Sequence, residues 1–235
     1  SLVLCLGVLA PVMAEDGDTK PTTYTDVSEA GPDYQIQGEY EGEFEVNGDA
    51  TKVGFQVIAL GEENFRGIAM LGGLPGDGWD GFTKLEAEGT RNEDGLVVLE
   101  AAEGTAEVKD GKIIVKSLDG QELGTLERVE RKSPTLGMKP PEGAVVLFDG
   151  TTSENFEGGK MTEEEFLMAG CKSKQSFDGD FTLHIEFRTP FMPTARSQQR
   201  GNSGVYLQER YEVQMLDSFG LEGLHNECGG IYSLH

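Results

Sequence analysis

The sequence predicts an all-β protein of two domains. Strand-like segments in its first half are separated by Asp94-Gly95, Asp110-Gly111 and Asp119-Gly120. Each Asp-Gly pair favours a tight turn, because glycine tolerates positive φ. Apolar and polar residues alternate over 181–188, which is the period of a β-strand. A Pro/Gly stretch at 132–143 predicts a linker between the two halves.

The composition limits the classes of function. The 235 residues suffice for one large or two modest domains, and the net charge is −23. Such acidity argues against binding to nucleic acid or anionic membranes, because both need a basic footprint. It favours solubility instead, and scattered acids would bind divalent cations only weakly. Past the N-terminus no apolar run is long enough to span a membrane. The sequence does not predict an oligomeric state.

The first residues are apolar and predict export. Residues 1–14 (SLVLCLGVLAPVMA) are similar to the hydrophobic part of a secretory signal, with small residues at Val12 and Ala14 before the cleavage point. We therefore expect a signal remnant and a periplasmic or extracellular protein. A buried segment of the fold is one alternative, and a lipid anchor at Cys5 is another. Residues 15–33 are polar without periodicity and predict a flexible leader.

Residues 34–131 predict a small β-meander. Tyr34, Ile36 and Tyr40 mark an expected first strand. A hairpin follows, with its turn at Asn47-Gly48, a favoured pair for two-residue connections. The three Asp-Gly turns then repeat the rhythm of strand and turn, which is typical of a meander.

Residues 144–235 predict the second domain. We expect a strand at Val145–Phe148, at most one helical turn near Thr162, and a further strand over 181–188. In that strand the apolar residues face a core, and Thr182, His184, Glu186 and Arg188 share the other face. The long loop at 189–204 carries two arginines and is a candidate functional loop.

The segment 205–215 repeats the alternation. Tyr206, Gln208, Glu212 and Gln214 are expected on its polar face, and Tyr211, Val213 and Met215 in the core. Two interpretations of these polar faces are open. They are either an ordinary wet surface or a floor that binds a polyol.

Four segments of the second half resemble the 3-keto-disaccharide hydrolase domain family, also described as 3-keto-glucoside lyase/hydratase. They are LFDGTTSENF at 147–156, FDGDFTLHIEFRTP at 177–190, GNSGVYLQERYEVQMLDSFG at 201–220 and NECGGIY at 226–232. The resemblance covers about residues 144–235. It implies an antiparallel jelly-roll sandwich of the concanavalin-like lectin/glucanase type, with sugar on its concave face, in a secreted bacterial protein. The chain stops within a strand-like run, so we expect a C-terminally truncated domain.

The resemblance also implies a substrate whose sugar ring is oxidised at C3. The ketone acidifies the C2 proton, so that a base can remove it and the glycosidic oxygen can leave, after which water adds. Such chemistry needs a base near C2, an acid near the leaving oxygen and a group that stabilises the enolate. Direct hydrolysis by a carboxylate pair is the alternative reaction. A non-catalytic carbohydrate-binding or adhesion module is the alternative function, because fold does not fix function.

The candidate site residues follow from the polar faces and the resemblance. Glu212 and Glu186 are the expected acid/base residues, and we expect them to project into one hollow wide enough for a pyranose. For each carboxylate the alternative is a partner within an ordinary solvated sheet. The expected substrate-binding residues are Arg188, Asn202, Tyr206, Gln208, Gln214 and Asp217.

No spacing in the sequence requires a metal or a disulfide. Cys171 and Cys228 either pair in an oxidising compartment or remain separate thiols. Together with His184, His225 and His235 they show no zinc spacing. A divalent metal ion held by acids or histidine would suit the stabilisation of an enolate, and Asp217 is a candidate ligand.

Overall fold

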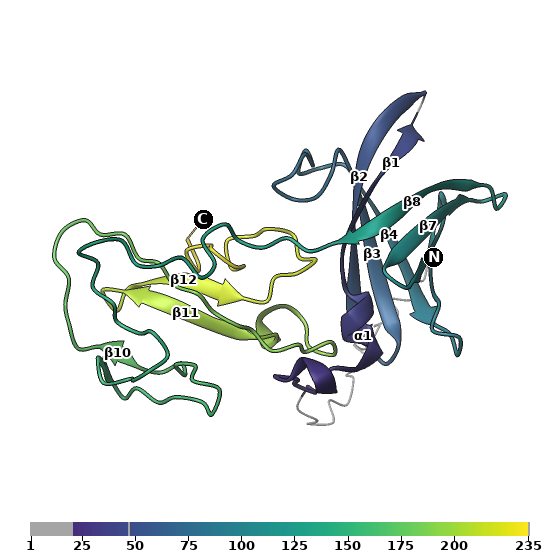
Figure 1. The fold of residues 1–235 in the computed structure, drawn as a ribbon. Helices are drawn as coiled ribbons and strands as arrows, with labels where there is room; N and C mark the ends of the chain where they lie inside the picture. The colour runs from purple at the N-terminus through teal and green to yellow at the C-terminus, as the bar shows by residue number, and fades with distance from the viewer. Residues whose placement is uncertain (1–20, 47, 235) are drawn as a thin grey trace, which may run out of the picture.

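The computed structural model describes residues 21–46 and 48–234. Within them, β1 to β8 form an antiparallel barrel, in which each strand pairs with the next and β8 closes on β1. In Figure 1 this barrel lies to one side and the C-terminal half to the other. The predicted all-β class and the meander are confirmed. The closure of the meander into a barrel was not predicted.

The barrel strands follow the chain order, with short turns between most of them. The strands are β1 Gly38–Val46, β2 Asp49–Gly61, β3 Asn64–Leu71, β4 Lys84–Arg91, β5 Val97–Ala101, β6 Gly104–Lys109, β7 Lys112–Ser117 and β8 Glu122–Val129. The first hairpin pairs Val46 with Asp49 on either side of the predicted turn at Asn47-Gly48, of which Asn47 lies outside the described residues. The Asp-Gly pairs lie between β4 and β5, between β6 and β7 and between β7 and β8, so these turns are confirmed.

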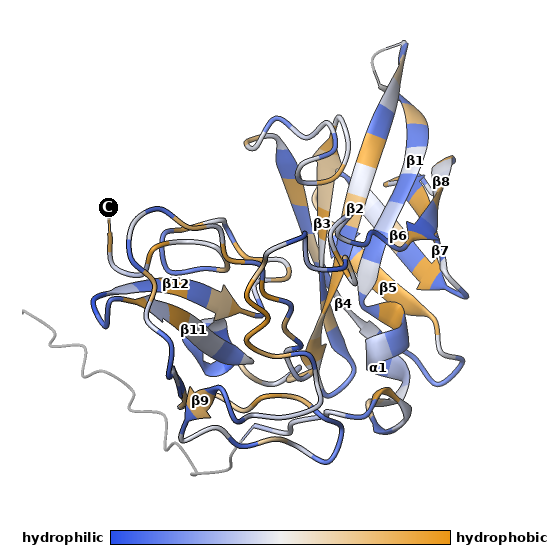
Figure 2. Cartoon of the chain, turned by 60° about the vertical axis from the view of Figure 1, so that its left-hand side comes forward, coloured by the Kyte–Doolittle hydropathy of each residue, from blue (hydrophilic) through white to orange (hydrophobic). Residues whose placement is uncertain are grey.

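The barrel interior is filled by apolar side chains. Tyr40, Phe65, Leu99, Ile113 and Leu126 are all at most 1% exposed. They come from β1, β3, β5, β7 and β8, because alternate residues of each strand point inward. Bands of opposite hydropathy along the barrel strands show this alternation in Figure 2. The interior is therefore a packed core that stabilises the fold.

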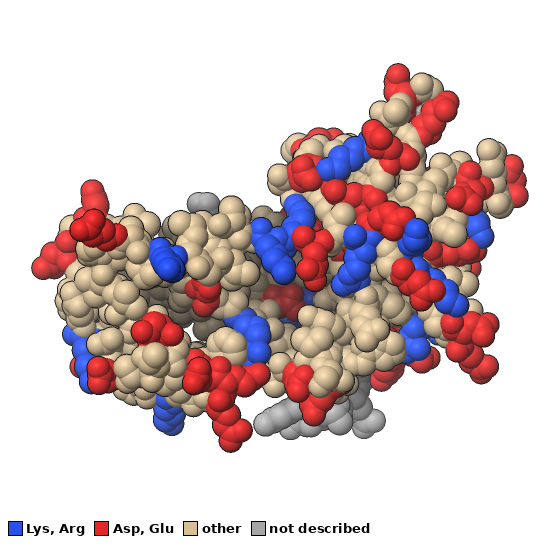
Figure 3. Space-filling model, viewed as in Figure 1, with Lys and Arg blue, Asp and Glu red and all other residues tan. Residues whose placement is uncertain are grey.

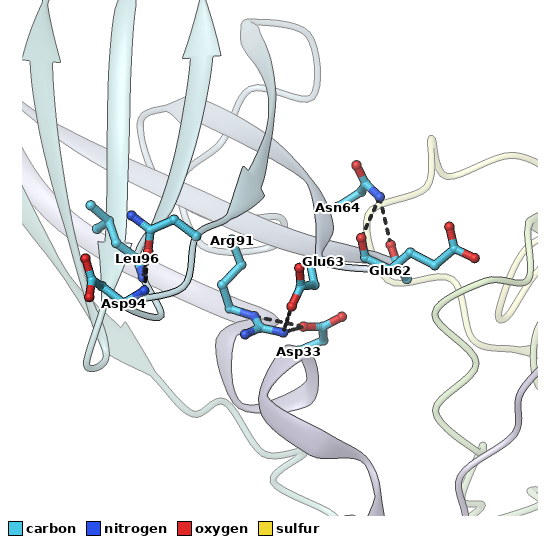
Figure 4. Close-up of polar contacts among 9 residues, drawn as sticks. Asp33, Glu62, Glu63, Asn64, Arg91, Asp94 and Leu96 are labelled. Atoms are coloured by element: carbon cyan, nitrogen blue, oxygen red, sulfur yellow. Dashed lines mark hydrogen bonds and ion pairs between the residues drawn. The ribbon is translucent and has the colours of Figure 1, made fainter.

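A short helix lies beside the barrel where a strand was expected. Helix α1 (Gly31–Ile36) follows the 3₁₀ turn η1 (Val27–Glu29), so the prediction of a strand at Tyr34 and Ile36 was wrong. The reason is local, because Pro32 lies at the start of the helix and an acid follows in its first turn. Arg91 of β4 holds the helix through an ion pair to Asp33 (3.3 Å) and also pairs with Glu63 in the turn between β2 and β3 (3.0 Å), as Figure 4 shows.

The barrel also packs on the C-terminal half. A second cluster of Ile58, Ile68, Met70 and Leu74 lies on the outer side of β2 and β3, and Phe219 packs against it. Strand β2 is consequently buried on both faces over residues 53–59. Tyr24 and Phe191 exchange two backbone hydrogen bonds of 2.9 Å, so the segment before α1 also contacts the second half.

The C-terminal half contains short strands in the part of the chain that the structure describes. They are β9 Phe156–Glu157, which pairs with β10 Lys172–Ser173, and β11 Asn202–Leu207, which pairs with β12 Tyr211–Leu216. The 3₁₀ turn η2 (Ser197–Gln199) precedes β11. This half is β-structured, in keeping with the predicted class.

Two local expectations in this half were wrong, because residues 145–148 and 181–188 are not strands. The region near Thr162 is a turn closed by a bridge from Met161 to Leu167, which is compatible with the expectation of at most one helical turn. A strand needs a neighbour for its backbone groups, and within the described residues no segment pairs with 181–188. Its apolar side chains are therefore about half exposed, as for Phe181 at 54%.

On the face that Figure 3 shows, the charged residues do not form one patch. In Figure 3 basic side chains are interspersed among more numerous acidic ones on the face shown. Among the helices of the described residues, none has the length and apolar character needed to cross a membrane. The expected signal remnant at 1–14 and the leader up to residue 20 lie outside the described residues.

Candidate functional site

The hairpin of β11 and β12 gathers most of the predicted site residues. Its register pairs Asn202 with Leu216, Gly204 with Gln214, and Tyr206 with Glu212. Directly opposite residues of an antiparallel pair share a face, and so do alternate residues of each strand. Asn202, Tyr206, Glu212 and Gln214 therefore lie on one face of the hairpin.

Glu212 is held at this face by two neighbours. The hydroxyl of Tyr206 donates a 2.8 Å hydrogen bond to Oε2 of Glu212. The carboxylate leans over Gly204, since a Cβ added there would lie 2.1 Å from Oε1. Glycine at 204 is thus needed for a close approach, although its φ is not in the left-handed region. Oε2 of Glu212 thus accepts the hydrogen bond from Tyr206, while Oε1 lies against Gly204.

The pair also changes the acidity of the phenol. The hydrogen bond to Glu212 is the main cause that raises the pKa of Tyr206 above its ordinary value of 10.0. Desolvation raises this pKa too, as does the electrostatic effect of Glu212 and of Tyr232. Tyr206 therefore stays a proton donor across the physiological pH range.

Gln214 lies next along the same face and is almost completely buried at 2% exposure. Its Nε2 donates to Asn202 Oδ1 (3.0 Å) and to Gln198 Oε1 (2.8 Å). Asn202 in turn donates to the backbone carbonyl of Gln198 at 2.9 Å. These amides form a connected polar network beside Glu212, in which each buried group has a partner.

Gln198 is the member of this network that the sequence did not reveal. It lies in η2, within the loop at 189–204, and its side chain also donates to the carbonyl of Asn226 at 2.6 Å. The signal available in the sequence was the unusual length of that loop. It gave no means of choosing Gln198 among the polar residues there.

Arginines on either side of Gln198 fix the loop. Arg196 donates to the carbonyl of Leu60 at 2.8 Å, which ties the loop to β2 of the barrel. Arg200 donates to the carbonyl of Phe219 at 2.8 Å and forms a 2.9 Å ion pair with Asp217. The side chains of that pair are only 7% and 13% exposed. The structure therefore places Asp217, a predicted substrate-binding residue, in a buried ion pair.

Gln208 is not on the strand face where it was expected. It lies with Glu209 in the turn that joins β11 to β12, and both residues have positive φ, 55° and 54°. The hairpin needs this left-handed backbone to reverse direction. The turn thus takes Gln208 out of the strand alternation.

The burial of the hairpin faces also differs from the expectation. Gln214 and Leu216 are each 2% exposed, whereas Tyr211, expected in the core, is 44% exposed. The physical reason is that the loop at 189–204 packs on the polar face, where Gln198 accepts a hydrogen bond from Gln214. The prediction that residues 211, 213 and 215 form the core was therefore wrong.

The hydrogen-bond partners of Glu186 come from the predicted linker and from its own segment of the chain. Its Oε1 accepts a 2.6 Å hydrogen bond from the backbone N–H of Gly137 and lies 3.0 Å from His184 Nε2. The bond to His184 and then that to Gly137 lower the pKa of Glu186. Neither of these two partners of Glu186 lies on the β11–β12 hairpin that carries Glu212. Glu186 is thus bound to the predicted linker at 132–143.

Arg188 is likewise engaged away from the hairpin. It forms a two-point ion pair with Glu164, in which Nη1 lies 3.2 Å from Oε1. Its guanidinium also stacks over the ring of Phe166, at 4.2 Å from the centroid. Glu164 is the main cause that raises the pKa of Arg188. The predicted strand, on one face of which Glu186 and Arg188 would both lie, is not formed.

The remaining candidate features give no further ligand set. In the described part of the chain, no group of three or more His, Cys, Asp and Glu side chains could hold a metal ion. Cys171 and Cys228 are both free thiols. Two shallow hollows, of about 410 and 290 Å³, lie on the barrel and are lined by neither Glu186 nor Glu212.

The C-terminal half thus carries a carboxylate, a phenol and amides on one face of the β11–β12 hairpin. Residues 143–235 match the family model of the 3-keto-alpha-glucoside-1,2-lyase-like domain. This match confirms the resemblance of the segment to the 3-keto-disaccharide hydrolase family. The family suggests a carbohydrate-active function on 3-keto sugars, and its name suggests a glycoside hydrolase or lyase. The chain has no match among curated proteins or among solved structures.

Proposed function

We propose that this protein is an exported enzyme that cleaves the glycosidic bond of 3-keto-glycosides by β-elimination, followed by hydration. The observation that carries the proposal is the Tyr206–Glu212 pair over Gly204, within the segment that matches the lyase-like family. The apolar stretch at residues 1–14 supports export.

In the proposed first step, Oε1 of Glu212 takes the proton from C2 of the 3-keto sugar. The C2–H electron pair becomes the enolate, which then re-forms the ketone and expels the glycosidic oxygen from C1. Tyr206 is the group beside Glu212 that can donate a proton to this oxygen. Water then adds across the C1–C2 double bond of the unsaturated sugar, so that the net reaction is hydrolysis.

The neighbouring amides support the same proposal. Asn202 is exposed on the same face as Glu212 and accepts a hydrogen bond from the buried Gln214, so its side chain is held where it can contact a sugar. Glu212 is partly buried, so its carboxylate acts with limited competition from water. Glu186 is instead an exposed carboxylate engaged with Gly137 and His184. The geometry therefore supports Glu212 as the base more strongly than Glu186.

Turnover of a 3-keto-α-glucoside by wild-type protein tests the proposal. We expect release of the aglycone, and a decrease in kcat of about 10²–10⁴-fold in Glu212→Gln, the range for loss of general acid–base catalysis. Glu186→Gln is the matched control and should retain activity within a few-fold. Equal activity of all three proteins would contradict the role of Glu212.

A carbohydrate-binding module is the second candidate function. The barrel is attached to the C-terminal half through Arg196 and through Phe219, which would suit a module that presents a sugar-binding face. Such a protein would bind the glycan without turnover. Binding that is unaffected by Glu212→Gln, with no aglycone released by the wild type, would favour this function.

A further inference from the structure

A third segment pairs with β12 on the edge opposite β11. Gln214 N donates to Gly230 O and Tyr232 N donates to Glu212 O, both at 2.9 Å. Val213 and Ile231 form an antiparallel bridge between these hydrogen bonds. In Figure 1 this segment belongs to the yellow end of the chain, near β12. The hairpin is therefore extended by the residues around Ile231.

The register of this pairing fixes the position of Tyr232. Because Val213 lies opposite Ile231, Glu212 lies opposite Tyr232, and opposite residues share a face. Glu212 thus lies between a tyrosine on each neighbouring segment, Tyr206 and Tyr232. The electrostatic effect of Tyr232 on the phenol of Tyr206 agrees with this placement, because it contributes to the raised pKa.

Both tyrosines are available to a ligand. Tyr206 is 61% exposed and Tyr232 is 42% exposed, although each lies beside a partly buried carboxylate. An aromatic ring offers an apolar face and, in tyrosine, a hydroxyl at its tip. A pyranose has the complementary surface, namely an apolar C–H face and a rim of hydroxyl groups. Two rings on either side of Glu212 would hold such a ring over the carboxylate.

We propose that Tyr232 is a substrate-binding residue, which packs its ring against the pyranose at Glu212 from the side opposite Tyr206. This inference rests on the proposed function, because it takes the Glu212 face as the sugar site. Tyr232 was not among the site residues that we predicted from the sequence. It also predicts that affinity for the sugar depends on the flat ring of Tyr232 more than on its hydroxyl.

The test compares substitutions of Tyr232 with the same substitution of an exposed tyrosine on the other face of the hairpin, which is the matched control. Tyr211 is 44% exposed and alternates with Glu212, so it points to the opposite side of the hairpin. Binding of methyl α-glucoside, which has no ketone and cannot react, is measured by ligand-observed NMR. KM and kcat are measured with a 3-keto-α-glucoside. Thermal unfolding checks that each variant is folded.

We expect Tyr232→Ala to weaken binding and raise KM by about tenfold or more, with a smaller change in kcat. Tyr232→Phe should stay within about threefold of the wild type, and Tyr211→Ala should be unchanged. If Tyr232→Ala unfolds, Tyr232→Leu keeps apolar bulk at this edge without the flat ring and should show the same loss.

The outcomes separate this inference from the proposed enzyme activity. Loss of methyl α-glucoside binding in Tyr232→Ala supports the inference even if the wild type releases no aglycone, in which case the enzyme proposal alone fails. Unchanged binding in Tyr232→Ala overturns the inference. It is also overturned if the wild type binds no glucoside, or if Tyr211→Ala loses binding to the same extent.

Discussion

Tyr206 lies directly opposite Glu212 across the β11–β12 hairpin and donates a 2.8 Å hydrogen bond to Oε2. This contact sets the orientation of the carboxylate and joins an acid to a base on one sheet face. The same face continues through Gln214 and Asn202 to Gln198, which the long loop supplies. The site is therefore made by a hairpin and by a loop that the barrel holds.

Enlarging Gly204 should disable the site without unfolding the protein. In Gly204→Ala the added Cβ would lie 2.1 Å from Glu212 Oε1, so the carboxylate must move. We expect a decrease in kcat of at least about tenfold, because misplacement by about 1 Å is costly for catalysis. Ser203→Ala, on the other face of the same strand, is the control for kinetics and stability. Full activity of Gly204→Ala would show that this position of Glu212 is unimportant.

The phenol of Tyr206 should titrate above an ordinary tyrosine, because Glu212 raises its pKa. The stabilising contribution of the neutral phenol is therefore present below the ordinary pKa of 10.0 and is lost as the pH rises through the folded-state value. In Glu212→Gln the pKa should fall toward 10.0. The ¹³Cζ shift of Tyr206 against pH measures this value, and identical titrations in both proteins would contradict the contact.

The link between Glu186 and Gly137 should weaken in acid. The hydrogen bonds from His184 and Gly137 lower the pKa of Glu186, so their stabilisation is present above its ordinary value of 4.5. It is lost as the pH falls through the lower, folded-state value. The amide shift of Gly137 should follow that titration, and Glu186→Gln should abolish the pH dependence. An amide that titrates equally in the variant would assign the effect to another group.

Asp217 should contribute mainly to stability. Asp217→Ala removes one partner of a buried ion pair and leaves Arg200 unpaired, which typically costs about 3–5 kcal/mol. Denaturant unfolding measures the loss, and joint replacement in Arg200→Met with Asp217→Leu should recover part of it. A loss below about 0.5 kcal/mol, together with a raised KM, would support the substrate-binding role predicted from the sequence.

The barrel was largely predictable because its signals are local. Each Asp-Gly pair specifies a turn by its own backbone preference, and the strands between the turns can pair only with their neighbours. Closure of the barrel depends on the pairing of β1 with β8, which are far apart in sequence, and no local pattern predicts that pairing. The helix at 31–36 had a local signal in Pro32 and Asp33, which the strand interpretation of Tyr34 and Ile36 overlooked.

The candidate site was harder to predict because its contacts are not local. The alternation correctly placed Tyr206, Glu212 and Gln214 on one face, because β11 and β12 are neighbours in sequence and pair with each other. The same alternation predicted a strand at 181–188, but this segment has no partner in the described structure, so the strand face expected to carry Glu186 and Arg188 did not form. Gln198 enters the site only through the path of its loop, which Arg196 and Arg200 fix by contacts distant in sequence.

The fate of the C2 hydrogen tests the central claim most directly. A 3-keto-α-glucoside labelled with deuterium at C2 is converted in ordinary water, and the label in the 3-keto sugar product is measured by mass spectrometry. The label of the free product incubated with Glu212→Gln gives the background exchange. We predict that wild-type turnover replaces the deuterium with hydrogen and that Glu212→Gln leaves the substrate labelled and uncleaved. A cleaved product that keeps its C2 deuterium would contradict removal of this proton by Glu212.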